Sequence, residues 1–291
     1  MVLLVAAGIY LRRRSVITDE GRDCLSDLLT MLILPCNIFL SFEGNTDMSA
    51  LKSSLLTVII SVLVMLCTAI LGKVIYRHRE ERKAKVFRYG LVNSNALFIG
   101  LPIIQSLLGD AGVLQLSMYM IFVRMFCWSY GLSLYTGVKS DWKGSFKRLL
   151  THPCMIAAAL GVAAMVTGIR LPAFLDRTLQ YVSSCLMALS MLLIGVVLSE
   201  IKLKEVFRGD VWRFTALRLG VMPGIVFGLC KLCGVPYIVT ATCTLVSGMP
   251  AASLTAVLAA RYHGDSELGA LLVAVSTILS AVTIPLLSIP A

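Results

Sequence analysis

Apolar residues fill most of the chain in long runs that short polar and charged stretches separate. A helix needs about 20 such residues to cross the ~30 Å hydrocarbon layer of a bilayer. Most of the runs reach that length, and the loops between them are short. The pattern predicts ten spans, at about 1–11, 23–42, 51–75, 86–108, 112–137, 153–169, 173–198, 211–231, 236–261 and 267–289.

The first apolar run, Met1 to Leu11, is shorter than the others and ends at Arg12–Arg14. At 1.5 Å per residue it reaches only about 16 Å, which is too little to span a bilayer. Its charges follow the apolar run, whereas those of a signal peptide precede it. We expect that the natural start lies roughly ten residues upstream; the alternative is a helix that lies only partly in the membrane.

Polar and helix-breaking residues interrupt the fourth span. Asn93, Ser94 and Asn95 lie in its middle, and Gly100 and Pro102 follow. Proline removes a backbone hydrogen bond, glycine loosens the helix, and buried amides need partners. A helix broken inside a membrane is tolerated only where protein or a water-filled cavity surrounds the break.

The ninth span repeats this feature in the second half of the chain, with Ser247, Gly248 and Pro250. Both interrupted spans therefore contain a Gly-x-Pro triplet. Interrupted helices at corresponding places in two halves indicate a repeat-built transporter with its site near the bilayer midplane. The alternative is coincidence, because glycine and proline are common in membrane helices. We predict a substrate site where the two breaks meet, with Gly100, Pro102, Gly248 and Pro250 as crossover or hinge residues.

Composition supports an all-α integral membrane protein. Of the 291 residues, 58% are hydrophobic and 14% are charged, and the mean hydropathy is +0.87; soluble domains carry about 25% charged residues. The net charge of +10 does not call for a nucleic-acid partner, because the basic residues gather in alternate loops, as the positive-inside rule requires. The opposite loops hold only Lys52, Arg170, Arg177 and Lys231.

This charge asymmetry predicts that both termini lie outside. Five spans per half is an odd number, so the second half enters the membrane inverted relative to the first. We predict a 5+5 inverted repeat, with a first repeat at 1–137, a cytoplasmic linker at 138–150 and a second repeat at 151–291.

The sequence offers no chemistry typical of an enzyme. It contains no G-x-x-x-x-G-K-[ST] run for ATP and no nucleophile–base pair. Its nine cysteines are scattered, and Cys230 and Cys233 lack a second ligand pair, so buried free thiols are expected. We therefore predict no catalytic residue, no metal and no cofactor.

Arg124 lies near the middle of the fifth span, without an acidic residue at comparable depth. A cation there is costly unless it faces a partner or water, and a guanidinium binds a carboxylate through two hydrogen bonds. We predict that Arg124 contacts an anionic substrate; the alternative is that it binds backbone carbonyls freed at a helix break. Arg218 lies closer to a helix end, and we expect it to extend to the interface.

Asn93, Asn95 and Ser247 are the predicted polar lining of the breaks, together with Asn37 of the second span. The alternative is that they hydrogen-bond between helices as structural contacts. The positive ends of the half-helices that follow the breaks would also suit an anion. The lack of a carboxylate at mid-membrane argues against a carboxylate proton relay, which leaves a uniporter, an exchanger or a carrier of a protonated acid.

The chain resembles the auxin efflux carrier family, which includes the plant carriers and many bacterial relatives, over nearly its whole length. The resemblance rests on five stretches in order: GIYLRRRSVITDEG, LILPCNIF, NSNALFIGLPI, LLIGVVL and SGMPAASLTAVLAARYHGD. It implies ten helices in a five-plus-five inverted repeat, a scaffold and a transport domain, elevator-type alternating access, and organic anions such as auxin or malonate as substrates. Near Arg124 the family pattern leads us to expect a polar uncharged residue. The charge therefore suggests a more acidic substrate, such as a dicarboxylate.

We therefore expect a carrier of small organic anions in the inner membrane of a bacterium, because the linker between the halves is short. The expected partners are the substrate and the lipid bilayer, with no nucleic acid. The oligomeric state, including a homodimer, stays open. Two alternatives remain: a sodium-coupled carrier of the bile-acid-transporter type, and a membrane sensor on the same fold that binds without translocating.

Overall fold

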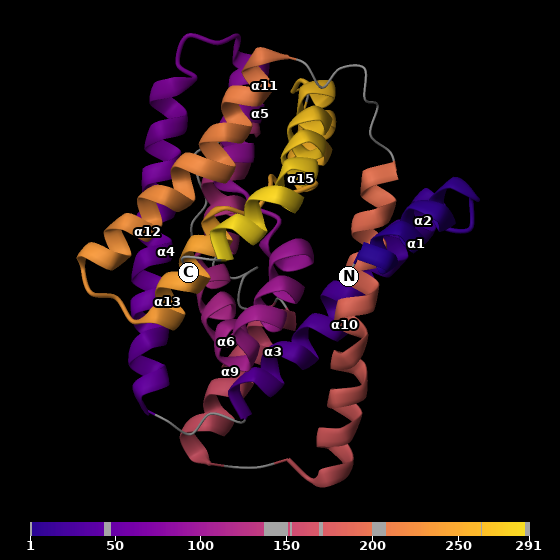
Figure 1. Ribbon diagram of the computed structural model, residues 1–291, viewed down its shortest axis with the longest axis vertical. Helices are drawn as coiled ribbons and strands as arrows, with labels where there is room; N and C mark the ends of the chain where they lie inside the picture. The colour runs from indigo at the N-terminus through magenta and orange to yellow at the C-terminus, as the bar shows by residue number, and fades with distance from the viewer. Residues whose placement is uncertain are drawn as a thin grey trace.

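The computed structural model describes residues 2–43, 48–136, 151, 153–168, 171–199, 208–262 and 264–288. The elements of this part of the chain are helices, together with one isolated β-bridge. Figure 1 shows α4 and α10 as long helices on opposite sides of the molecule, with α6, α13 and α15 between them. The α-helices are α1 (Val2–Arg13), α2 (Asp19–Leu28), α3 (Leu34–Glu43), α4 (Met48–Ile75), α5 (Glu81–Val92), α6 (Leu101–Phe126), α7 (Leu132–Thr136), α9 (Pro153–Thr167), α10 (Ala173–Ser199), α11 (Gly209–Ala216), α12 (Met222–Leu232), α13 (Tyr237–Ser247), α14 (Leu254–Arg261) and α15 (Ser266–Ser288).

Six helical stretches of the described chain are long and apolar enough to cross a bilayer. This confirms a multi-pass membrane protein, whereas ten spans in a 5+5 repeat stay a prediction. The six stretches are Asp19–Leu40, Lys52–Ile75, Ala96–Tyr135, Ala173–Val196, Gly209–Leu232 and Ser266–Ser288.

Gly109 divides the longest of these stretches. The 40 residues from Ala96 to Tyr135 would extend about 60 Å as one straight helix, roughly twice the hydrocarbon thickness. Gly109 adopts φ +61° and ψ −155° in the middle of α6, a conformation that interrupts the helix and that glycine tolerates best. The chain therefore bends where the sequence separates its fourth and fifth spans.

Single π-helical turns occur at four places in the apolar helices of the described residues. The turns are η1 (Leu29–Ile33), η2 (Ala96–Gly100), η3 (Cys127–Gly131) and η5 (Leu217–Val221). Such turns are rare overall, but those that occur are often found at functional sites. The extra residue changes the direction of the side chains around it. Two of them, η2 and η5, border the candidate site described below.

Close backbone contact joins α1 to α10. A Cβ atom on Gly8 would lie 2.2 Å from the carbonyl oxygen of Leu192, and one on Gly195 would lie 2.1 Å from that of Val5. Small residues let membrane helices approach so closely, and van der Waals packing then replaces the hydrophobic driving force that lipid cannot supply. These two glycines therefore hold the first helix against the second half of the chain.

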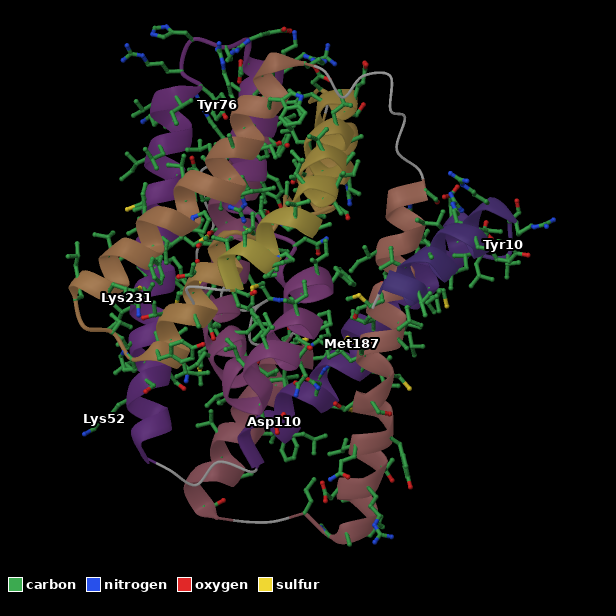
Figure 2. All side chains as sticks on the ribbon, in the orientation of Figure 1. Tyr10, Lys52, Tyr76, Asp110, Met187 and Lys231 are labelled. Carbon is green, nitrogen blue, oxygen red and sulfur yellow. The ribbon has the colours of Figure 1, made fainter. Side chains whose placement is uncertain are left out.

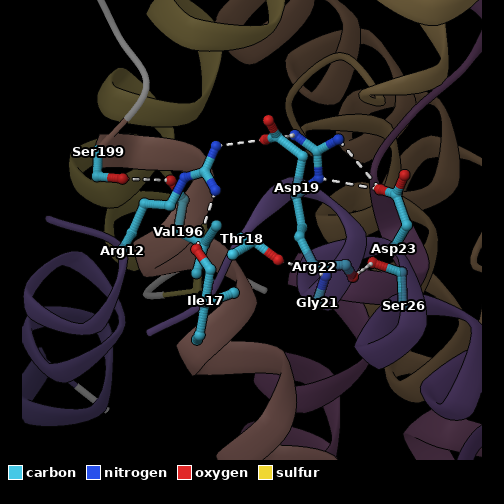
Figure 3. Close-up of polar contacts among 10 residues, drawn as sticks. All are labelled: Arg12, Ile17, Thr18, Asp19, Gly21, Arg22, Asp23, Ser26, Val196 and Ser199. Atoms are coloured by element: carbon cyan, nitrogen blue, oxygen red, sulfur yellow. Dashed lines mark hydrogen bonds and ion pairs between the residues drawn. The ribbon is translucent and has the colours of Figure 1, made fainter. Parts of the chain in front are cut away.

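Polar contacts fix the turn between α1 and α2 (Figure 3). Arg12 Nη1 donates to the carbonyl oxygen of Ile17 at 2.9 Å, and its Nη2 pairs with the carboxylate of Asp19. Thr18 caps α2 by accepting a hydrogen bond from the amide of Gly21 at 3.1 Å. Side-chain hydrogen bonds and an ion pair thereby fix the turn between α1 and α2.

The buried apolar residues of the described chain form two clusters, and the interrupted helices pass between them. Val92 and Met249 belong to the larger cluster, among α3, α4, α6 and α13. Leu91 and Ala251 belong to the smaller one, among α5, α11, α14 and α15. The junction between the two clusters therefore runs through the residues where the helices are broken.

Candidate functional site

Two unwound stretches meet in the middle of the fold and hydrogen-bond to each other. The first lies between α5 and η2, at 93–95, and the second lies between α13 and α14, at 248–253. The amide of Asn95 donates to the carbonyl of Pro250 at 2.8 Å, and the amide of Ala252 donates to the carbonyl of Asn93 at 3.1 Å. Ser94 lies opposite Ala251 in this short antiparallel bridge. The backbone groups that the breaks release thus satisfy one another, as a membrane interior requires.

A third helix supports this crossing. The amide of Ala251 donates to the hydroxyl of Ser276 in α15 at 3.1 Å, and that hydroxyl donates to the carbonyl of Leu272 at 2.6 Å. Both Ala251 and Ser276 are fully buried. The hydroxyl of α15 therefore pairs an amide that would otherwise be buried beside the crossing without an acceptor.

Arg218 joins the two interrupted helices through their backbone. Its Nε donates to the carbonyl of Met249 at 3.0 Å, and its Nη1 donates to the carbonyl of Leu91. An intact helix would pair the Leu91 carbonyl with the amide of Asn95, but that amide bonds to Pro250 instead. The guanidinium therefore donates a hydrogen bond to a carbonyl oxygen that lacks its helical donor because of the break.

The expectation that Arg218 extends to the membrane interface is wrong. Its side chain is 2% exposed and is the largest of the fully buried ones in the described chain. Sequence reasoning judged its depth along an unbroken helix and missed it as a site residue. Hydrogen bonding to backbone carbonyls freed at a helix break was the alternative role considered for Arg124. In the structure it is Arg218 that makes these bonds. A cation within an apolar span that also contains Pro223 was the signal that could have found it.

The first break lies upstream of the Gly-x-Pro triplet. Gly100 is helical and its amide bonds to the carbonyl of Asn95 at 3.3 Å, while Pro102 lies in the first turn of α6, where its missing N–H costs little. Gly100 has a packing role instead, since a Cβ there would lie 3.3 Å from the Cγ of Met249. The structure thus brings Gly100 against the second break.

In the second half, the break coincides with the predicted residues. Gly248 and Pro250 lie in the unwound stretch, and a Cβ on Gly248 would lie 2.6 Å from a Leu287 methyl carbon of α15. Motion at either glycine is not tested by this geometry, so the hinge role of Gly100, Pro102, Gly248 and Pro250 stays a prediction.

The predicted polar residues differ in how their side chains are engaged. Asn93 donates to the hydroxyl of Tyr89 at 3.0 Å, and the hydroxyl of Ser247 donates to the carbonyl of Thr244 at 2.8 Å. These bonds stay within one helical segment each. Asn95 is 9% exposed, and its side-chain amide makes no hydrogen bond within the described residues. The side-chain amide of Asn95 therefore has a donor and an acceptor group that could hydrogen-bond to a substrate at the crossing.

Asn37 lies between two other helices. Its Nδ2 donates to the hydroxyl of Ser183 in α10 at 2.7 Å, which joins α3 to α10. Its Oδ1 is buried and has no hydrogen bond within the part of the chain that the structure describes. The bond to Ser183 fits the interhelical role of a membrane asparagine.

Arg124 lies in the last turn of α6. The thiols of Cys154 in α9 and of Cys127 lie near its guanidinium, and Cys127 also lies near Arg218. The hydroxyl of Tyr119 is buried without a hydrogen bond among the described residues and also lies near Arg218. Two arginines and a phenol from α6 and η5 therefore occupy one region beside the crossing.

Comparison with known proteins places this arrangement in a class. A fold of several bilayer-length helices around two broken segments is that of a multi-pass membrane transporter. The chain belongs to the membrane transport protein family, the auxin efflux carrier family, whose family model matches residues 1–288.

Two relatives are similar over almost the whole chain. An uncharacterized transporter of Methanocaldococcus jannaschii is 25% identical over 98% of this chain and 95% of its own. An uncharacterized transporter of Methanothermobacter thermautotrophicus is 26% identical over 99% of this chain and 95% of its own. These names indicate a transporter and not an enzyme.

Proposed function

We propose that this protein is a carrier of small organic anions, mono- or dicarboxylates, which it moves across the membrane by elevator-type alternating access. The observation that carries the proposal is the crossing of two interrupted helices with Arg218 bound to both. Broken helices at mid-membrane are where secondary transporters bind their substrates. The family and the names of the two relatives support transport as the function.

The charge at the crossing favours an anion. Arg218 bonds to two neutral carbonyl oxygens, and the ion pairs of the described chain do not include it. Its positive charge is therefore not cancelled by a carboxylate in that part of the protein. A guanidinium has five N–H donors, so donors remain beyond the two that bind Met249 and Leu91. An anion with carboxylate geometry matches such a group.

The same contacts disfavour sodium at the crossing. A sodium site of the bile-acid-transporter type would use backbone carbonyls of the crossing helices. Here the carbonyls of Leu91 and Met249 accept from Arg218, and those of Asn93 and Pro250 accept amides of the opposite stretch. A guanidinium beside these oxygens would also repel a second cation.

The pairing of the two breaks suits an inverted repeat. Asn95 donates to the second stretch and Ala252 donates back to the first, so that two reciprocal backbone bonds join the two halves. We propose the ten-span, 5+5 arrangement on this basis, with both termini outside and scaffold and transport subdomains drawn from both repeats. The proposed location is the inner membrane of a bacterium.

Substrate counterflow in proteoliposomes tests the proposal. We expect the native protein to exchange labelled malonate, and Asn95→Asp to reduce the rate more than Asn95→Ala, because a carboxylate at the crossing would repel the anion. Ser184→Ala is the control, since its exposed hydroxyl bonds only within α10. Equal rates in the native protein and both Asn95 variants would remove Asn95 from the site.

A second comparison separates the remaining roles. Arg124→Ala with unchanged counterflow would assign Arg124 a structural role and leave the carrier proposal intact. Saturable binding of malonate, measured by calorimetry, without counterflow would identify the non-translocating sensor. Neither binding nor counterflow with malonate, succinate, oxalate or indole acetate would contradict the proposed substrate class.

A further inference from the structure

A groove lies where α4, the turn after it and α11 meet, apart from the crossing. Its volume is about 430 Å³, and its lining includes the side chains of Tyr76, Arg79 and Arg213 together with Ile75, Leu217 and Val221. It therefore combines two cations with an apolar floor. Figure 2 shows Tyr76 at the end of the molecule where many nitrogen-tipped side chains gather.

The groove is placed at the boundary between lipid and water. The apolar span Lys52–Ile75 ends immediately before Tyr76, and the charged turn follows. Ile75 and Val221 are 47% and 49% exposed, so that their side chains face outward on the lipid side of the groove. Arg79 and Arg213 are exposed beyond them. A molecule in the groove would thus have one end in the hydrocarbon and the other among cations.

The charges of the lining leave an excess of positive charge. Asp210 also lines the groove, but its carboxylate lies 3.5 Å from the Nε of Arg208 and accepts the amide of Val211. Asp210 is thereby paired with Arg208, and the two arginines of the lining outnumber this one carboxylate. Arg79 and Arg213 do not appear in the ion pairs of the described residues.

Tyr76 gives the groove a rigid wall and a donor. Its ring stacks on Phe87 of α5 with centroids 4.5 Å apart and planes 2° from parallel. Burial raises the pKa of Tyr76 to about 12, with Arg79 opposing the rise and Asp210 adding to it. The phenol is therefore protonated at neutral pH and can donate a hydrogen bond to an oxyanion.

We propose that this groove binds an anionic phospholipid, with its phosphate between Arg79 and Arg213 and an acyl chain along Ile75, Leu217 and Val221. Basic pockets between membrane helices at the headgroup level suit anionic lipid heads. An apolar floor that opens to the lipid side favours a lipid over a free phosphate ion, which would gain nothing from burying apolar surface.

Native mass spectrometry of the detergent-purified protein with added phosphatidylglycerol tests this site. We expect bound lipid on the native protein, and an affinity about 25-fold lower for Arg79→Gln/Arg213→Gln, since each arginine near an anionic head contributes roughly fivefold. Arg77→Gln is the matched control, because Arg77 is exposed on the same turn but is not part of the lining. Circular dichroism checks that both variants are folded.

Two further arms identify the ligand. We expect phosphatidylcholine to bind more weakly than phosphatidylglycerol, and glycerol 3-phosphate to compete only at much higher concentrations, because it lacks acyl chains. Equal affinity of the double variant and the native protein for phosphatidylglycerol would overturn the site. Full competition by glycerol 3-phosphate at the lipid concentration would overturn the lipid and leave an anion site.

Discussion

The Nε of Arg218 lies 3.0 Å from the carbonyl oxygen of Met249, within the second break. Through its other hydrogen bond, to Leu91, the same side chain reaches the end of α5. A cation buried in a membrane protein costs several kcal/mol unless it is paired or hydrogen-bonded. The two carbonyls, released by the breaks, supply that pairing, so the arginine and the broken helices stabilise each other.

Removing the guanidinium is therefore expected to destabilise the crossing. Arg218→Met leaves two buried carbonyls without a donor, at about 1–3 kcal/mol each, which corresponds to a melting temperature lower by roughly 10 °C. The measurement is a thermal melt in detergent. Lys231→Gln, an exposed cation on α12, is the control. A melting temperature of Arg218→Met that equals the native value would show that these bonds do not support the fold.

The hydroxyl of Ser276 offers a finer test of the same region. Ser276→Ala leaves the amide of Ala251 unpaired and is expected to cost about 1–3 kcal/mol and to slow malonate counterflow. Ser280→Ala is its matched control, because that buried hydroxyl lies one turn further along α15 and bonds only to Thr277. Indistinguishable melts and rates in the two variants would argue against a role for α15 at the crossing.

The contact of α1 with α10 predicts a contrast between two glycines. Gly195→Ala places a methyl group 2.1 Å from the Val5 carbonyl oxygen, so the helices must separate at a cost of about 1–3 kcal/mol. Gly228→Ala on α12 meets nothing within 4 Å, and alanine favours the helix by up to about 1 kcal/mol. Thermal melts should show a loss for the first variant and no loss for the second. The reverse order would contradict the packing of α1.

Cysteine labelling tests the proposed orientation. Cys233 is exposed in the turn between α12 and α13, which the charge pattern places outside, whereas Arg79 belongs to a turn placed inside. With the other cysteines replaced by serine, a membrane-impermeant maleimide should label Cys233 in intact cells. An Arg79→Cys variant that lacks Cys233 should react only after permeabilisation. The opposite pattern would place both termini inside.

The sequence by itself predicted a helical membrane protein, its family and the two interrupted segments. Hydropathy and helix breaking are local properties that can be summed along the chain. They suffice to find apolar runs and to place Asn93, Asn95, Gly248 and Pro250 in two special stretches.

Only the tertiary structure decided which groups meet at the breaks. Arg218 bonds to residues 127 and 31 positions away along the chain, and the bridge of Ser94 with Ala251 joins the two halves. Such partners depend on which backbone groups a break releases and which helix passes nearby. Counting residues along an ideal helix therefore predicts that Arg218 lies at the interface, whereas the folded chain buries it between two carbonyl oxygens.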